Sequence, residues 1–214
     1  MEANRVANTL SKTRLYSPSA IGDILRISRE RARQEEQRTK KYMAEALGIT
    51  VERLTRMEQG TSQVPFEIAQ EWCSILKDYT ALKKIKHIYG LALPPVDPWL
   101  LQSIPNQLTN FIQQATGAIE AAKKLLHMSK QLRFNDPISE SMRHDMLKYA
   151  EEVLDVQQAS DCVLAALRIN WDLDYEILVK NWIQEAIADR VIIPSVSQFE
   201  TIRKETFFQE RAGR

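Results

Sequence analysis

The sequence predicts an all-α protein in two parts: four or five short helices near the N-terminus, then a bundle of longer helices. Three observations support this prediction. Apolar residues recur at helical spacing along most of the chain. Only six glycines and eight prolines interrupt its 214 residues. The composition, 44% apolar and 27% charged residues, is typical of a helix-rich globular protein.

A cluster of prolines marks the expected boundary between the two parts. Pro94, Pro95 and Pro98 fall within five residues, and proline restricts both its own backbone and that of the preceding residue. We therefore expect a flexible arm at residues 1–18, a small domain at 19–93, a proline-rich linker at 94–98 and a second helical domain at 99–214.

Charge is distributed unevenly between these parts. Residues 1–90 carry 16 Lys and Arg against 11 Asp and Glu, whereas residues 91–214 carry 13 against 17. A basic N-terminal part indicates a polyanionic partner for that part.

Several classes of function find no support in the sequence. No apolar run of about 18 residues and no signal peptide is present, so we expect a cytoplasmic protein. Cys73 and Cys162 lie inside helical patterns and are expected to be reduced core thiols. The three histidines, His87, His127 and His144, fit no metal or catalytic spacing. We expect neither catalytic residues nor a metal nor a cofactor.

The N-terminal helices follow from periodicity and capping signals. An amphipathic helix is predicted from Ser19 to about Arg38, with a highly charged second half. Thr39 is a good N-cap for a second helix, which ends at Gly48. Thr50 then caps a third helix that ends at Gly60. A helix beginning with Pro65 in its first turn and a short lysine-rich helix complete the small domain.

The C-terminal helices are longer. One helix is predicted over residues 106–132 and a second from Asp136–Pro137, joined as an antiparallel pair, with two further helical segments beyond Asn170. The expected seam of the first is Leu108, Ile112, Ala115, Ile119, Ala122 and Leu126. The expected seam of the second is Met142, Met146, Tyr149, Val153, Val156, Ser160, Val163 and Leu167. Such seams serve either a bundle within one chain or a dimer.

Residues 39–60 resemble the Cro/repressor-type helix-turn-helix family, also called the Xre family. The pattern of that family is matched at Thr39, Lys40, Met43, Ala44, Leu47, Gly48, Ile49, Thr50, Leu54, Thr55, Glu58 and Gly60. Only Lys40, where the family has glutamine, is a change of kind. The resemblance covers about residues 20–78, and it implies that the third helix enters the major groove of double-stranded DNA.

The resemblance also implies roles for individual residues. Base edges are expected to meet Val51, Glu52, Thr55 and Arg56, and the outer face of the helix also exposes Thr50. Phosphates are expected to meet Thr39, Lys40 and Thr61. Ala44, Gly48 and Leu54 are implied to shape the motif, and Glu58 is implied to pair with Arg29, or failing that Arg33, on the first helix.

Two assignments stay open. Val51 lies three residues before Leu54, so it is either partly buried or available to DNA, and Glu52 and Arg56 are spaced to form a surface ion pair instead. The chain between Arg29 and Thr39 is about four residues longer than the family pattern, close to one helical turn, which favours an extended first helix.

The function expected from these observations is sequence-specific transcriptional regulation. Family members usually bind as dimers, so we expect a homodimer, held by the C-terminal helices, on a pseudo-palindromic operator. The alternative is an antitoxin-like or adaptor protein, in which the acidic C-terminal part captures a protein partner and DNA contact is secondary or absent.

Overall fold

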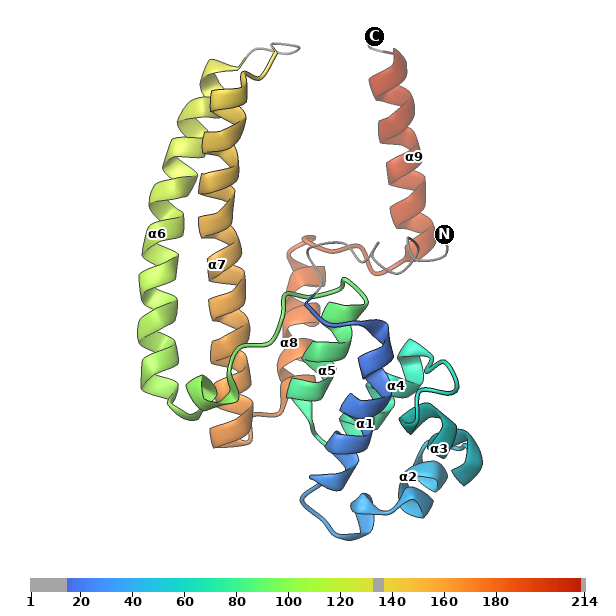
Figure 1. The fold of residues 1–214 in the computed structure, drawn as a ribbon. Helices are drawn as coiled ribbons and strands as arrows, with labels where there is room; N and C mark the ends of the chain where they lie inside the picture. The colour runs from blue at the N-terminus through green and yellow to red at the C-terminus, as the bar shows by residue number, and fades with distance from the viewer. Residues whose placement is uncertain (1–14, 133–136, 213–214) are drawn as a thin grey trace, which may run out of the picture. The chain divides into compact units, whose positions relative to one another are not determined.

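The computed structural model describes residues 15–132 and 137–212, in which all regular structure is helical (Figure 1). This confirms the predicted all-α class. The helices are α1 (Ile21–Glu30), α2 (Lys40–Ala46), α3 (Val51–Glu58), α4 (Phe66–Ile75), α5 (Tyr79–Ile88), α6 (Ile104–Gln131), α7 (Glu140–Trp171), α8 (Tyr175–Ala188) and α9 (Val196–Ala212). Short 3-10 turns occur at Pro18–Ala20, Glu36–Arg38 and Pro98–Gln102. Most of the predicted arm, residues 1–14, lies outside the described residues.

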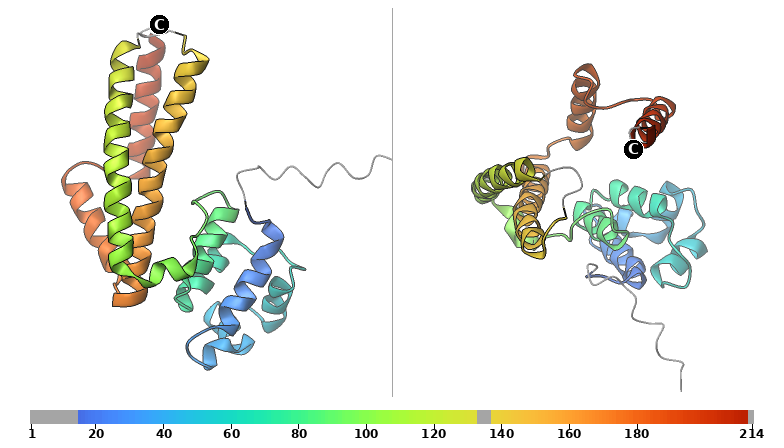
Figure 2. Two further views of the ribbon diagram at one scale, coloured as in Figure 1. Left: turned by 60° about the vertical axis from the view of Figure 1, so that its left-hand side comes forward. Right: turned by 90° about the horizontal axis from the view of Figure 1, so that it is seen from above.

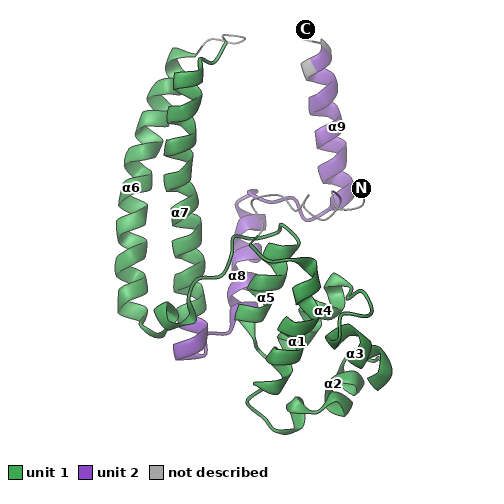
Figure 3. Ribbon diagram, in the orientation of Figure 1, with its two compact units in different colours: residues 1–166 green, residues 167–214 purple. Residues whose placement is uncertain are grey.

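Two compact units make up the chain, residues 1–166 and residues 167–214 (Figure 3). The division falls within α7, and not at the prolines. The sequence-based boundary at residues 94–98 separates the short helices from the long ones and stays a prediction about domains.

Helices α1 to α5 enclose one core of large apolar side chains. Leu25, Met43, Leu54, Trp72 and Ile85 are completely inaccessible to solvent. Each comes from a different helix, so no two of these short helices bury their apolar faces alone. The core therefore fixes the positions of all five helices.

The caps at the two short helices explain where each begins and ends. The Thr39 hydroxyl accepts a hydrogen bond from the Tyr42 N–H at the start of α2, and the Thr50 hydroxyl accepts one from the Arg53 N–H at the start of α3. Gly48 and Gly60, just beyond these helices, have φ of 64° and 68°. This left-handed conformation is the one that glycine adopts without steric strain.

The prediction of an extended first helix is wrong. Helix α1 ends at Glu30, and residues 31–39 form a loop with a single 3-10 turn. Ala32 is buried in the core, and its carbonyl accepts a hydrogen bond from Arg38 Nε at 2.8 Å. A straight continuation of α1 would withdraw Ala32 from this core, so the added residues close as a loop instead.

The start of α4 also differs from the prediction. Pro65 is the N-cap of α4 and not its first helical residue. Its ψ of 145° is extended, so the chain turns into the helix one residue later than expected.

Helices α6 and α7 form an antiparallel pair, seen side by side in two orientations (Figures 1 and 2). Lys124 Nζ of α6 lies 5.1 Å from the centroid of the Tyr149 ring of α7. The second long helix begins later than predicted, at Glu140. Asp136 lies outside the described residues, and Pro137 precedes the helix, whose first turn is capped by the Ser139 hydroxyl at 3.2 Å from the Met142 N–H.

The predicted α6 seam is the exposed side of that helix. Ile112 is 65% exposed, and Ile119 and Leu126 are each 56% exposed. The buried positions of α6 are Ile104, Gln107 and Ala121. These positions fit a heptad that is shifted one residue toward the N-terminus of the predicted seam.

On α7 the predicted seam is half right. Most of its members are partly buried, but Val153 is 48% exposed. The fully buried positions are Ala159, Cys162 and Ala166, none of which was in the predicted seam. In the same stretch, Gln158 and Asp161 accept hydrogen bonds from Lys83 Nζ of α5, at 3.2 Å and 2.9 Å.

Unit 2 contains α8 and α9 and has little core of its own. On α8, Ile177 and Trp182 are each 57% exposed, and Ala186 is the buried position. The Asp174 carboxylate caps α8 by accepting from the N–H groups of Glu176 and Ile177. Among the described residues, no helix combines the length and apolarity that a bilayer crossing requires.

Candidate nucleic-acid interface

One side of helix α3 packs against the core, and the other side is exposed to solvent. Leu54, Met57 and Glu58 are buried on its inner side. On the outer side Glu52 and Arg56 are exposed, and Val51 is 39% exposed. The outer side of α3 is thus available to a partner. For Val51, this exposure favours availability to DNA over partial burial.

A buried ion pair joins α3 to α1. Arg29 Nε donates to Glu58 Oε1 at 2.6 Å, and Arg29 Nη2 donates to Glu58 Oε2 at 3.1 Å. The two side chains are only 8% and 1% exposed. Such two-point pairing fixes both the distance and the orientation between the groups. Arg29, and not Arg33, is therefore the partner of Glu58.

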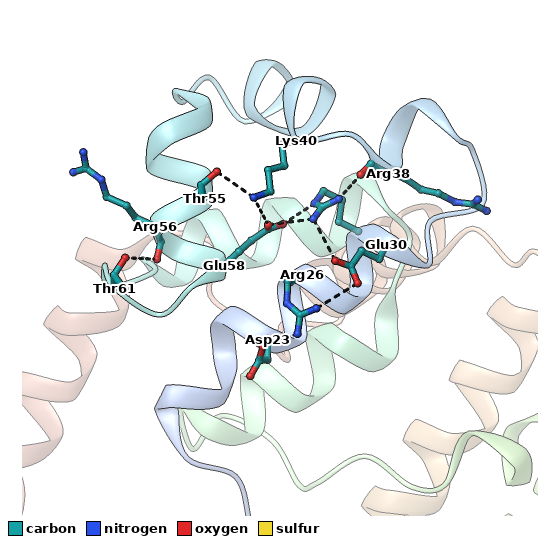
Figure 4. A network of polar contacts seen from close by, with 10 residues as sticks. Asp23, Arg26, Glu30, Arg38, Lys40, Thr55, Arg56, Glu58 and Thr61 are labelled. Carbon is teal, nitrogen blue, oxygen red and sulfur yellow. Dashed lines mark hydrogen bonds and ion pairs between the residues drawn. The ribbon is translucent and has the colours of Figure 1, made fainter.

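Arg29 also anchors the loop between α1 and α2. Its Nη1 donates to the Arg38 carbonyl, and Arg38 in turn donates to the Ala32 carbonyl. One guanidinium thus holds α1, the loop and α3 together (Figure 4). No local sequence pattern indicated a role for Arg38, because that role depends on the loop found in place of the expected helical turn.

Lys40 points toward this network. Its ammonium donates to Thr55 Oγ1 at 3.3 Å and lies 3.5 Å from Glu58 Oε2 (Figure 4). The Lys40 side chain is 40% exposed. Lys40 and Thr55, expected to meet phosphate and base respectively, thus contact each other.

The remaining threonines of the site are engaged in backbone capping. Thr39 donates its hydroxyl proton to the Glu36 carbonyl at 2.8 Å while capping α2, and Thr50 caps α3. At the other end of α3, the Thr61 N–H and hydroxyl both donate to the Arg56 carbonyl, at 2.9 Å and 3.1 Å. Their hydroxyls therefore fix the ends of the two helices.

Arg56 and Glu52 remain separate on the outer side. No ion pair joins them, which sets aside the surface-pair reading, and the Arg56 guanidinium points away from the network around Glu58 (Figure 4). Both side chains are free to meet hydrogen-bonding groups of a partner.

Small residues allow the helices of this domain to pack closely. Ala44 is 2% exposed where α2 meets the core, as its small size suggested. A Cβ on Gly22 of α1 would lie 2.5 Å from the Met57 carbonyl oxygen and 2.9 Å from that of Glu58. Sequence reasoning missed Gly22, although a glycine inside a helix is itself a signal of close approach.

This arrangement suits groove recognition. Within the described part of the chain, no group of three or more His, Cys, Asp or Glu side chains could hold a metal ion. Helix α3 is short and fixed on its inner side. Its Arg56, Glu52 and partly exposed Thr55 side chains supply donors and acceptors that complement those of base edges in a major groove.

Comparison with known proteins agrees with this geometry. No curated protein and no solved structure matches the chain significantly. Residues 30–81 match the family model described as helix-turn-helix, from the last residue of α1 to Ala81 in α5. The match contains the whole of α2, the turn and α3. Residues 30–81 therefore match a helix-turn-helix of the Cro/C1 type, which supports DNA binding in general.

Proposed function

We propose that this protein is a sequence-specific transcriptional regulator that reads DNA with α3. The observation that carries the proposal is the two-sided environment of α3. Its inner side is fixed to α1 by the Arg29–Glu58 pair, while Glu52 and Arg56 are exposed on its outer side. A rigid helix with free polar side chains can enter a major groove without rearrangement.

The outer side chains have distinct preferences among bases. Arg56 can donate two hydrogen bonds to guanine O6 and N7, Glu52 can accept from the cytosine amino group, and Val51 can contact a thymine methyl. Thr39 at the start of α2 and Thr61 just beyond α3 lie where helix-turn-helix proteins meet phosphates.

Selection of binding sites from random duplexes tests this function. We expect the wild-type protein to enrich one sequence, and Arg56→Ala to lose preference at one base pair while still binding DNA. Arg203→Ala is the matched control, because it removes an exposed arginine from α9 that pairs with Glu200. An Arg56→Ala selection identical to that of the wild type contradicts the assignment of Arg56.

We further infer that the protein binds as a homodimer through α6 and α7. Leu108, Ile112, Ile119 and Leu126 form an exposed apolar stripe on α6, spaced by four, seven and seven residues. Such a stripe suits the heptad packing of a second helix. A two-fold dimer places two copies of α3 about one turn of DNA apart, which predicts a pseudo-palindromic operator.

Substituting charged residues into the apolar stripe of α6 tests the proposed dimer. Sedimentation equilibrium of the Ile112→Glu, Ile119→Glu double variant is expected to show a monomer, because two carboxylates cannot be buried at an apolar contact without large loss. Gln113→Glu, on the adjacent exposed position, is the control and should stay dimeric. A monomeric wild-type protein at micromolar concentration contradicts the dimer.

The same stripe supports the second candidate function, an antitoxin-like or adaptor protein that binds another protein. This function predicts a monomeric wild-type chain and no enriched duplex even at low salt. Enrichment of a palindrome contradicts it.

A further inference from the structure

Lys40 is held between two groups of α3 in a way that the phosphate-binding role does not explain. It is the first residue of α2, yet its ammonium lies 3.5 Å from Glu58 Oε2 and 3.3 Å from Thr55 Oγ1. Glu58 is 1% exposed and already pairs with Arg29. An ammonium beside a buried carboxylate is held more strongly than one beside a solvated phosphate, since less water screens the pair.

Lys40 determines which way the Thr55 hydroxyl points. An ammonium has three donors and no acceptor, and a threonine hydroxyl has one proton. Thr55 Oγ1 must therefore accept from Lys40, and its own proton must be directed elsewhere. Among the described residues, no acceptor receives that proton.

Thr55 borders the open side of α3. Thr55 is partly exposed and lies one turn from Glu52 and beside Arg56, on the side of α3 that is open to a partner. In the major groove, guanine offers N7 and O6 as acceptors, adenine N7 and thymine O4, whereas the major-groove edge of cytosine offers an amino donor.

We propose that Lys40 is a positioning residue: by donating to Thr55 Oγ1 it leaves the hydroxyl proton for DNA, so that Thr55 favours guanine, adenine or thymine over cytosine. This inference rests on the proposed function. It assigns Lys40 to base preference, whereas a lysine on a phosphate contributes equally to every sequence.

The neighbouring lysine provides a matched comparison. Lys41 is exposed on the same turn of α2, and no hydrogen bond or ion pair joins it to another described residue. Lys41 is thus free to approach a phosphate, while Lys40 is engaged. The two residues differ in surroundings and not in charge.

Site selection with four variants tests the inference. The full-length wild-type protein, Lys40→Met, Lys40→Arg, Thr55→Val and Lys41→Met are each selected against random duplexes, and binding to the best site is measured over a range of salt. Folding of each variant is checked by thermal unfolding. The Thr55→Val arm tests the same contact without removing a charge.

We expect Lys40→Met and Thr55→Val to lose discrimination against cytosine at the same base position, by roughly three- to tenfold for one hydrogen bond. Lys40→Arg keeps the donor and should keep the preference. Lys41→Met should keep the preference and reduce the salt dependence of binding by about one phosphate contact.

Two results overturn the inference. If Lys40→Met weakens binding to all sequences equally, lowers the salt dependence and leaves the preferred site unchanged, Lys40 binds phosphate. If the wild-type protein itself enriches no site, the proposed function fails, and the inference that rests on it fails with it. The wild-type arm distinguishes the two cases.

Discussion

Helices α1 to α5 and the pair α6–α7 are both helical, but they bury different kinds of side chain. The first region buries large residues such as Leu25, Leu54 and Trp72 completely. The α6–α7 pair buries Ala121, Ala159 and Ala166 while leaving Ile112 and Ile119 more than half exposed. The first region thus buries its large apolar side chains, whereas the second leaves several of them exposed.

This difference corresponds to two tasks. Reading base edges requires a helix held within a fraction of an ångström, which a close-packed core with a buried ion pair provides. Association requires apolar surface that is not used up by folding. Five predictions test the comparison, from the largest expected effect to the smallest.

Removing the buried carboxylate should be the most damaging change. Glu58→Ala leaves Arg29 as a buried charge without its main partner, which lowers the free energy of unfolding by about 3–5 kcal/mol. Urea unfolding monitored by hydrogen exchange of α1–α5 peptides measures this loss. Glu52→Ala, an exposed glutamate of the same helix, is the control and should change stability by less than about 0.5 kcal/mol. Equal effects of both variants would contradict the structural role of Glu58.

Truncating one aliphatic residue in each region should give unequal losses. Leu54→Ala removes a completely buried side chain and should cost about 2–5 kcal/mol. Ile112→Ala removes a side chain that is 65% exposed and should change the monomer by less than about 0.5 kcal/mol. The same unfolding measurement at low protein concentration compares them. A large loss for Ile112→Ala in a monomer would show that α6 is covered within one chain.

Alanine in place of glycine should have opposite signs in the two regions. At Gly22 the new Cβ meets backbone oxygens of α3 at 2.5 Å and 2.9 Å, so Gly22→Ala should destabilise by about 1–3 kcal/mol. At Gly117 in α6 its closest neighbour is the Glu152 carboxylate at 3.0 Å, the end of a flexible side chain. Gly117→Ala should therefore stabilise α6 by about 0.5–1 kcal/mol. Thermal unfolding of both variants measures the signs, and a shared sign would contradict the comparison.

The two cysteines report on the two regions separately. Burial, with a further contribution from Asp78, raises the pKa of Cys73 in α4 to about 12, and burial raises the pKa of Cys162 in α7. Both thiols are then protonated at pH 8 and react slowly while folded. With increasing urea, we expect iodoacetamide to modify Cys162 before Cys73, because α7 buries smaller side chains. Simultaneous modification would mean that the two regions unfold together.

The Cys73 shift also sets a direction for pH dependence. The pKa of the thiol is raised from 9.0 in the ordinary state to about 12 in the folded protein. Unfolded chains therefore lose the proton first as the pH rises above about 9, and the stability of α1–α5 falls from there toward pH 12. Cys73→Ala should remove this contribution to the alkaline loss.

Sequence alone predicted the N-terminal region well because its signals are local and chemically distinct. Thr39, Gly48, Thr50 and Gly60 mark helix ends by capping and backbone preference, and the structure places caps and left-handed residues there. The class of the fold and the type of the helix-turn-helix were predicted correctly for the same reason.

Other features depended on contacts that no local pattern records. The loop before Thr39 is set by Ala32 and Arg38, which meet only after the chain has turned. The predicted α6 seam is one residue away from the buried positions, because Ile112 and Ile119 are large aliphatic residues at helical spacing, whereas the buried Ala121 gives little apolar signal. The direction of Lys40 depends on Glu58, eighteen residues away.

One measurement tests the central claim, that α3 reads DNA sequence, most directly. The affinities of the wild-type protein and of Arg56→Ala are compared for the selected duplex and for a scrambled duplex at the same salt concentration. We predict that the wild type prefers the selected duplex by at least about a thousandfold. Arg56→Ala should reduce that ratio by about 5- to 150-fold, the equivalent of 1–3 kcal/mol. Equal affinity of the wild type for both duplexes would contradict the claim.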